Sequence, residues 1–432
     1  MATELRPLSD ADPAALAALL RARHDRHRSA EPLLAAADAA AEIADLLGRQ
    51  RLSGAVAVHG GETVGYLAGE LREKRFWGSH AWIDHAAHAA AEPELLRDLY
   101  AAAAPGWIEA GARLHLAMVP ATGDQMDPWY RLGFGQMQVE GIRRSGARPQ
   151  PLPDGLSVRQ AGRDDLERVA RETGRLIWEH QQGAATFTGL DIPDVASMLS
   201  AWVAHGAHAA ADPELMRDLY AAAAPAWIEA GAHLQLALVP ATGDQMDPWY
   251  RLGFGQMQVE GIRESGAPQQ PLPDGLTVRV AVRDDLPAVA EQHGMLVWEH
   301  QQRSATFTGL EPPDRKAVVA DWLETFDEQA ETLFVAERDG ELLGSTLCGR
   351  PPHAIGVPGD AVRLEFAAVL PQARGRGVGR ALADASFAWA REAGYGTIVT
   401  DWRSPNLLAS RFWPARGFRP VFHRMHRMTG IG

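Results

Sequence analysis

The amino-acid sequence predicts domains of the α+β class, and its length and two patterns support this. The chain has 432 residues, more than one hydrophobic core usually organises, so two or three domains are expected. Residues 362–427 read as strand, glycine-rich loop, helix, strand, helix, strand. Residues 55–68 and 333–347 each place two apolar runs around a turn, which indicates a β-hairpin. Hairpins combined with helix-linked strands predict mixed sheets flanked by helices.

Composition limits the partners that can be expected. Hydrophobic residues make up 46% of the chain and charged residues 22%, as in ordinary globular proteins. The formal net charge of −13 leaves no overall basic footprint of the kind that nucleic-acid binding favours. No apolar run is long enough to span a membrane, and the single Cys348 cannot form an internal disulfide. We therefore expect a cytoplasmic protein with small-molecule partners and no metal, nucleic acid or membrane partner.

A domain-sized repeat organises much of the chain. Residues 119–143 recur without a change as residues 239–263, at an offset of 120. With substitutions, the match extends over residues 81–202 against residues 201–322. The unit is much longer than a solenoid repeat of roughly 20–45 residues. Its closeness indicates a recent duplication or a recombined gene.

Proline-rich stretches divide the chain into three segments. Those at residues 149–153 and 268–273 are expected to be stiff linkers. They place domains at 1–148, 155–272 and 275–432, each beginning with a short strand pattern and an acidic helix start. The middle segment lacks a hairpin pattern. It therefore has too few predicted strands for an independent sheet and is expected to lean on its neighbours.

A candidate binding site follows the first strand of residues 362–427. Apolar and charged residues alternate over 362–366, as a half-buried strand requires, and the break at 367–369 predicts a bulge or local splay. Residues 374–379 then read Arg-Gly-Arg-Gly-Val-Gly before an amphipathic helix. The glycines allow backbone N–H groups to turn toward one point, and the helix N-terminus adds positive partial charge. The loop is a candidate phosphate cradle; the alternative is a tight turn that simply enters a helix.

Two motifs here resemble those of GNAT superfamily N-acetyltransferases. Arg374, Gly377 and Gly379 fill an R-x-x-G-x-G pattern, which is similar to the family's pyrophosphate-binding motif. Residues 406–418 resemble the family's next helix and its terminal Gly-Phe. Two motifs at the family's spacing, after a hairpin and a strand, are more specific than a glycine-rich turn alone. The resemblance implies acetyl-CoA as co-substrate.

The resemblance covers residues 275–428 well and residues 1–144 weakly. It implies a GNAT fold, a mixed V-shaped sheet flanked by helices, repeated in tandem with a degenerate N-terminal unit and an incomplete middle copy. At the loop position, the first unit has residues 85–90, which contain neither glycine nor arginine. Coenzyme binding is not expected there. His85 and His88 lack companion ligands and do not predict a metal site.

The resemblance also implies the site residues, in two groups. Backbone of the strand end would bind pantetheine and polarise the thioester carbonyl: Ala367, Ala368, Val369 and Leu370. The loop would hold the pyrophosphate through Gln372, Arg374, Gly375, Arg376, Gly377, Val378, Gly379 and Arg380, while Asn406 would contact the coenzyme arm. The implied reaction is direct attack of a small molecule's primary amine on the thioester, without a covalent enzyme intermediate.

Direct attack requires a base that takes the ammonium proton, and Glu365 is the candidate. Its position resembles the glutamate base of several GNAT enzymes; the alternative is an ion pair with Arg363 or Arg427. Trp413 stands where many GNAT enzymes place a tyrosine acid, and an indole N–H is not a practical acid. Water or another group such as Ser410 would then protonate the thiolate.

Two interpretations compete with these assignments. Because the tyrosine acid is missing, the chain could bind acetyl-CoA as a non-catalytic sensor or scaffold. His300, near the end of the first helix of the last domain, could assist proton transfer at the acceptor side, although packing is the alternative for a single histidine. The identity of the acceptor cannot be derived from these patterns.

Overall fold

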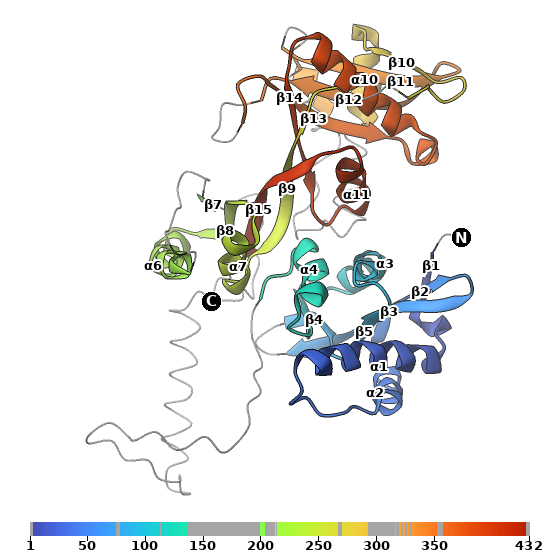
Figure 1. The fold of residues 1–432 in the computed structure, drawn as a ribbon, viewed down its shortest axis with the longest axis vertical. Helices are drawn as coiled ribbons and strands as arrows, with labels where there is room; N and C mark the ends of the chain where they lie inside the picture. Colours follow the sequence, from blue (N-terminus) through green and yellow to red (C-terminus); the bar gives the residue numbers. More distant parts are fainter. Residues whose placement is uncertain are drawn as a thin grey trace, which may run out of the picture.

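In the structure, a computed structural model, the described residues form two mixed β-sheets that are flanked by helices (Figure 1). The predicted α+β class and its tandem repetition are confirmed. The structure describes residues 3–136 except 75–77 and 113, residues 199–203, 212–266 except 213, 270–292 and 330–428 except 352–356, and single positions or pairs between 316 and 327.

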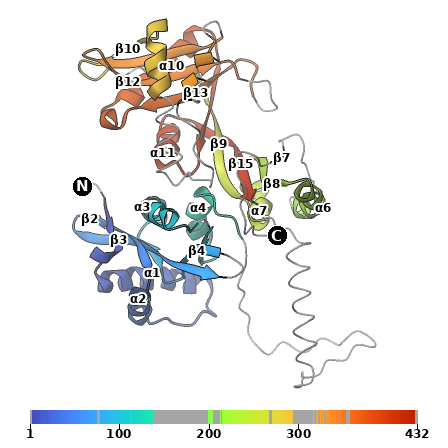
Figure 2. The same ribbon diagram turned by 180° about the vertical axis from the view of Figure 1, so that it is seen from behind.

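The first sheet has six strands in the order β1-β2-β3-β4-β6, with β5 paired to β3. Helices α1 and α2 lie on one side of it and α3 on the other (Figure 2). The elements are β1 Glu4–Pro7, α1 Pro13–Ala30, α2 Ala39–Leu47, β2 Leu52–His59, β3 Glu62–Lys74, β4 Gly78–Ile83, β5 His88–Ala90, α3 Leu95–Glu109, β6 Leu114–Ala117 and α4 Gly123–Arg131. The predicted β2–β3 hairpin is present, and Gly60 and Gly61 both adopt the positive φ that its turn requires.

The second sheet has nine strands in the order β10-β11-β12-β13-β14-β9-β15-β8-β7. Its elements are β7 Leu199–Val203, α6 Leu215–Glu229, β8 Ala232–Pro240, α7 Gly243–Arg251, β9 Gly255–Glu264, β10 Thr277–Val280, β11 Thr332–Arg338, β12 Glu341–Gly349, β13 Ala361–Val369, α10 Val378–Glu392, β14 Thr397–Arg403, α11 Leu407–Ala415 and β15 Arg419–Met428. The predicted hairpin is again present as β11 and β12, and its turn residues Asp339 and Gly340 have φ of 52° and 78°.

The middle segment and the last domain share this second sheet. Strand β9, which follows α7, is inserted between β14 and β15. Strand β15, which follows α11, pairs on its other edge with β8. β9 and β15, the equivalent strands of the two units, therefore lie side by side. β9 also pairs with β14 of the last domain, and β15 also pairs with β8 of the middle segment. The expectation that the middle segment leans on its neighbours agrees with this arrangement. The limits 155–272 and 275–432 remain a proposal about duplicated units, because the hydrogen bonding does not separate them.

The two identical segments of the repeat, residues 119–143 and 239–263, also contact each other. The rings of Tyr130 and Tyr250 stack with centroids 3.8 Å apart and planes 5° from parallel. A Cβ atom on Gly135 would collide with the carbonyl of Gly253, so this close backbone approach requires glycine. The contact connects the end of α4 in the first domain with the end of α7 in the second sheet.

No helix in the described part of the chain has the length and apolar character needed to cross a membrane. The cytoplasmic location remains a prediction.

Candidate active site

Strand β13 carries the candidate base at a bulge. Leu364 and Phe366 lie opposite two consecutive residues of β12, so Glu365 is an extra residue in the ladder. The sequence predicts a bulge or a local splay at residues 367–369. These residues keep regular partners on β12, so the bulge lies two residues earlier, whereas the alternative of a splay agrees with the end of the pairing between β13 and β14 at Leu364. A bulge turns the extra side chain away from the regular alternation of the strand.

The two central strands separate beyond this bulge. β13 pairs with β14 in parallel only as far as Leu364 and Thr400. β14 continues to Arg403, but there it pairs with β9 on its other edge. Among the described strands, none therefore pairs with the second half of β13 on the β14 side. This is the splay that the V-shaped sheet requires.

Backbone groups of β13 point into the splay. The N–H of Leu370 donates to the carbonyl of Leu343 on β12, at 3.0 Å. Because successive backbone groups of a strand point to opposite edges, the N–H groups of Ala367 and Val369 point away from β12. These are the groups that could polarise a carbonyl placed between the strands.

The glycine loop at the start of α10 has the conformation of an anion cradle. Gly375 and Gly377 have φ of 72° and 81°, in the left-handed region that glycine adopts at little cost. Gly377 is the N-cap of α10, and no side chain caps this helix. Among the described residues, no acceptor in good geometry meets the N–H groups of residues 375–380. Free N–H groups at a helix N-terminus attract anions.

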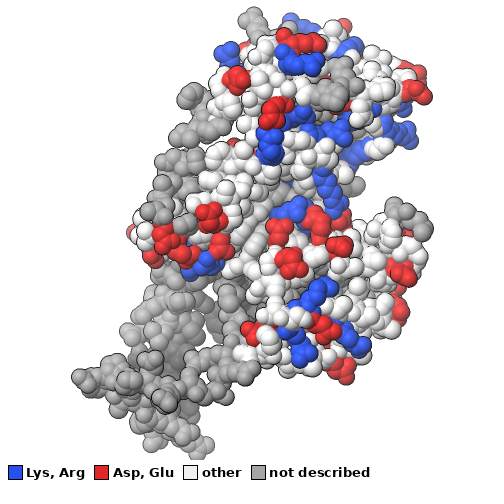
Figure 3. All heavy atoms as spheres, viewed as in Figure 1, with Lys and Arg blue, Asp and Glu red and all other residues white. Residues whose placement is uncertain are grey.

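The arginines of the loop differ in their contacts. Arg374 donates from Nε to the carbonyl of Val369, at 3.1 Å, which ties the loop to the strand end. Arg380 donates to the carbonyl of Pro271 and pairs with Asp384, so the proline-rich linker holds it. Arg376 and Gln372 are exposed. Basic side chains gather around α10 and α11 on this face of the molecule (Figure 3).

Helix α11 closes the site from the other side. Asn406 is its N-cap, and Oδ1 accepts from the N–H groups of Leu408 and Ala409. A Cβ atom on Gly379 would stand 3.4 Å from Val369 and 3.6 Å from Phe412. Strand end, glycine loop and α11 therefore meet at Gly379, as the sequence motifs predict.

Glu365 lies among charged side chains. Its Oε2 accepts a hydrogen bond from Nε of Arg363, at 3.0 Å, and Arg363 also pairs with Asp401. Burial raises the pKa of Glu365, and Asp401 and Glu331 act in the same direction, while Arg363 opposes them. The alternative partner Arg427 lies elsewhere, against Tyr220 of α6.

The described residues offer no obvious general acid that would protonate the departing thiolate. Trp413 is buried in the core and packs edge-on against Phe418, with ring centroids 5.4 Å apart. The Ser410 hydroxyl is buried and accepts a hydrogen bond from Nη2 of Arg97 at 3.0 Å. His300 lies outside the described residues.

The contact between α3 and α11 was not predicted from the sequence. Arg97 is fully buried and donates to the carbonyl of Ser404 as well as to Ser410. Beside it, Asp98 pairs with Arg411. No pattern could have revealed this, since the repeat carries the same Arg-Asp pair in α6, where Arg217 is 43% exposed and pairs with Glu214 on its own helix.

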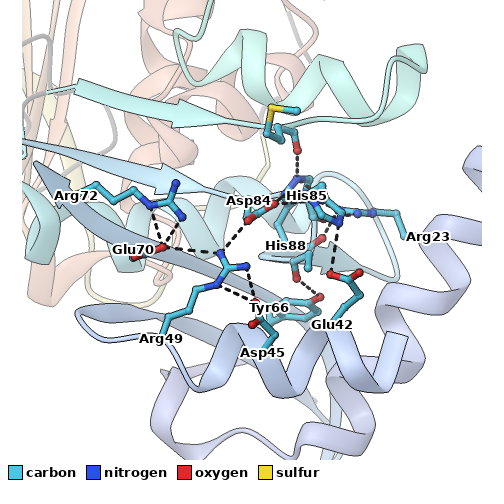
Figure 4. Close-up of polar contacts among 12 residues, drawn as sticks. Arg23, Glu42, Asp45, Arg49, Tyr66, Glu70, Arg72, Asp84, His85 and His88 are labelled. Atoms are coloured by element: carbon cyan, nitrogen blue, oxygen red, sulfur yellow. Dashed lines mark hydrogen bonds and ion pairs between the residues drawn. The ribbon is translucent and has the colours of Figure 1, made fainter. Parts of the chain in front are cut away.

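The first domain blocks its own loop position (Figure 4). Arg23 of α1 donates to the backbone carbonyls of His85 and His88. Carbonyls that converge on a guanidinium leave no amide cradle for an anion. Burial lowers the pKa of His88 to about 3, whereas the carboxylate of Asp84 raises the pKa of His85. In the described part of the chain, no group of three or more potential ligands could hold a metal.

Comparison with known proteins relates part of the last domain to one family. The sequence model of the acetyltransferase (GNAT) family matches residues 295–418. Mycothiol acetyltransferase of Cellulomonas flavigena is 30% identical over 157 residues, which are 35% of this chain and 42% of that protein. The chain thus matches less than half the length of this relative.

Solved GNAT structures are also similar to the chain. A GCN5-related N-acetyltransferase from Sphaerobacter thermophilus is 12% identical, with 99% of this chain and 97% of that chain covered and a TM-score of 0.34. The aminoglycoside N-acetyltransferase AAC(6')-Iy in complex with CoA is 22% identical, with 36% and 93% covered and a TM-score of 0.28.

Proposed function

We propose that the chain is an acetyltransferase that binds acetyl-CoA at β13, the glycine loop and α11, and transfers its acetyl group to a primary amine of a small molecule. The observation that carries the proposal is that, in the part of the chain that the structure describes, the N–H groups of residues 375–380 meet no acceptor in good geometry, next to a strand whose pairing with β14 ends at Leu364. The match of residues 295–418 to the GNAT family supports acetyl-CoA as the donor.

In this proposal, the N–H groups of Val378, Gly379 and Arg380 bind the pyrophosphate at the N-terminus of α10. Gln372, Arg374, Gly375, Arg376 and Gly377 complete that contact. Backbone of Ala367, Ala368, Val369 and Leu370 holds the pantetheine and the thioester. Asn406 contributes by fixing the start of α11, beside the coenzyme arm, because its Oδ1 is already used in capping.

Glu365 is the proposed base. It accepts a proton from the ammonium form of the acceptor, directly or through water. The free amine then forms the C–N bond while the C–S bond breaks, and the second proton that the nitrogen loses passes through water to the departing CoA thiolate. Because its pKa is raised toward neutral pH, Glu365 binds a proton more strongly than an ordinary glutamate and is therefore a better base.

One observation favours the competing function, a protein that binds acetyl-CoA without catalysis. Trp413 is buried where a tyrosine acid would stand, so the departing thiolate must be protonated through water or by another group such as Ser410. Thiolates are good leaving groups, and we therefore keep the enzyme as the first proposal.

Calorimetric titration with acetyl-CoA, followed by a thiol-release assay with a panel of primary amines, tests the proposal. Cys348 is buried and adds little background to a thiol assay. We expect saturable binding and amine-dependent CoA release. Binding without release for every amine would support the non-catalytic alternative, and absence of binding would refute both.

A further inference from the structure

Arg403, the last residue of β14, is a partly buried cation without a partner. Its Nη1 atom is buried and meets no hydrogen-bond acceptor, and no described carboxylate forms an ion pair with its guanidinium. Burial lowers the pKa of Arg403, and the neighbouring Arg424 acts in the same direction, while Asp401 opposes it. A buried charge without a partner costs free energy in the folded protein. An arginine that is kept despite this cost indicates that its partner is a ligand.

Arg403 lies on the face of the sheet that carries the proposed base. Residues two apart in a strand point to the same face, so Arg403 and Asp401 share one face. Trp402, between them, packs in the core that contains α10 on the other face. Asp401 pairs with Arg363, which also donates to Glu365. Glu365, Asp401 and Arg403 therefore lie on the same side of the sheet.

Arg403 also lies beyond the point where the two central strands separate. β13 and β14 pair only as far as Leu364 and Thr400, and Arg403 is three residues further along β14, where that strand pairs with β9. Glu365 and Asp401 are the first residues after the last pair. An acceptor whose amine lies at Glu365, next to a thioester in the splay, extends along β14, and Arg403 is the next charged residue on that strand.

The adjoining strands β9 and β15 leave Arg403 without a counter-charge. Arg403 and Arg424 of β15 are both paired in register with Gln258 of β9. Arg424 donates to Oε1 of Gln258 over 2.7 Å and lies 3.6 Å from Oε1 of Glu260. The oxygens of Gln258 and Glu260 are thus engaged by Arg424. One positive charge remains to be balanced, and a carboxylate supplies one negative charge with the planar shape that a guanidinium binds through two hydrogen bonds.

We propose that Arg403 binds a carboxylate of the acceptor, so that the acceptor is a primary amine with a carboxylate about 7 Å from its nitrogen. The spacing follows from the strand, because Asp401 lies level with Glu365 and Arg403 is two residues further, at about 3.3 Å per residue. The two ends of an extended dipeptide are also about 7 Å apart. A dipeptide thus has the required spacing. The inference rests on the proposed function, since Glu365 receives the amine.

Calorimetric titration of the protein–CoA complex with glycylglycine tests the proposal without turnover, because CoA has no acetyl group to transfer. We expect saturable binding, and binding about tenfold weaker for glycylglycine amide, which lacks the carboxylate. Arg403→Met should weaken the binding of glycylglycine about tenfold and remove the difference between the two dipeptides. The control is Arg338→Met, at another partly buried arginine, which lies on β11, two strands away from β14. This variant should keep the difference.

Two further measurements use the same variant. In the thiol-release assay, the ratio of kcat/KM for glycylglycine to that for its amide should be about ten in the wild type and about one in Arg403→Met. Arg403→Met should also raise the midpoint of urea denaturation, because it removes a buried charge without a partner. A lower midpoint would show that Arg403 has a structural partner and would overturn the proposal.

The carboxylate site and the proposed function fail in different ways. Binding of glycylglycine that depends on Arg403, without release of CoA from acetyl-CoA, would refute the transferase and support the carboxylate site. Release of CoA that is equally fast with both dipeptides, or a protein–CoA complex that binds neither of them or both equally, would overturn the carboxylate site and leave the transferase in place.

Discussion

The guanidinium of Arg97 donates a hydrogen bond to the hydroxyl of Ser410 over 3.0 Å, and thereby ties helix α3 of the first domain to helix α11 of the last. The same nitrogen also donates to the carbonyl of Ser404, just before α11. A domain without a usable loop of its own thus supports the helix that borders the proposed coenzyme site.

Replacing Arg97 should weaken the contact between α3 and α11. Arg97→Met removes two buried hydrogen bonds and should lower the free energy of unfolding by about 2 kcal/mol, with weaker acetyl-CoA affinity because α11 loses its contact. Urea denaturation and calorimetry measure the two effects. The matched control is Arg217→Met, the same position in the other copy, where the side chain is 43% exposed; equal effects of both changes would contradict the assigned role.

Gly377→Glu should abolish acetyl-CoA binding. The new side chain would bring bulk and negative charge to the amide cradle, and a Cβ atom there would stand 2.9 Å from Pro273. Gly394→Glu is the control, since Gly394 follows the same helix with φ of 87° and open space around it. Both variants carry backbone strain of about 1 kcal/mol or more, but only the first should lose binding. Unchanged affinity for acetyl-CoA in Gly377→Glu would remove the site assignment.

Glu365→Gln should slow turnover and leave acetyl-CoA affinity unchanged. Because the pKa of Glu365 is raised, the carboxyl group stays protonated to a higher pH than an ordinary glutamate. Activity of the wild type should therefore rise with pH as this group ionises, and the variant should lose that limb of the profile. Rate measurements against pH provide the test, with Glu264→Gln, an exposed pair with Arg419, as control. Identical profiles for wild type and Glu365→Gln would exclude a base role.

Acid should destabilise the first domain through His88. Its folded pKa of about 3 lies below the ordinary 6.5, so the unfolded state binds the proton first. The stabilising contribution is present above pH 6.5 and is lost as the pH falls toward 3, by about 1.4 kcal/mol per pH unit. Denaturation between pH 7 and 5 should show a flatter pH dependence for His88→Gln.

His85 should contribute to stability with the opposite pH dependence. Asp84 raises its folded pKa, so its contribution is complete below the unfolded value of 6.5 and is lost as the pH rises through the folded pKa. His85→Gln should therefore steepen the loss of stability on acidification. The same slope in both variants would contradict the different environments of the two rings.

The motifs allowed the glycine loop to be predicted because its chemistry is local. Positive φ at Gly375 and Gly377, the strand before them and the helix after them depend on consecutive residues. The bulge lies at Glu365 and not at residues 367–369, where the sequence predicts a bulge or a splay, because the position of a bulge depends on the register with β12. The contact between Ser410 and Arg97 could not be predicted, because the two residues lie far apart in the sequence.

The sequence by itself determined the α+β class, both hairpins, the repeat and the candidate cradle, since hydrophobic period and turn chemistry act over neighbouring residues. Only the tertiary structure decided that β9 lies between β14 and β15 and that Leu99 of α3 is buried while Leu219, the same position of the repeat in α6, is exposed. Identical residues met different surroundings, because burial depends on which strands pack against a helix, and the duplication copied the helix without β2 and β3, which pack against α3.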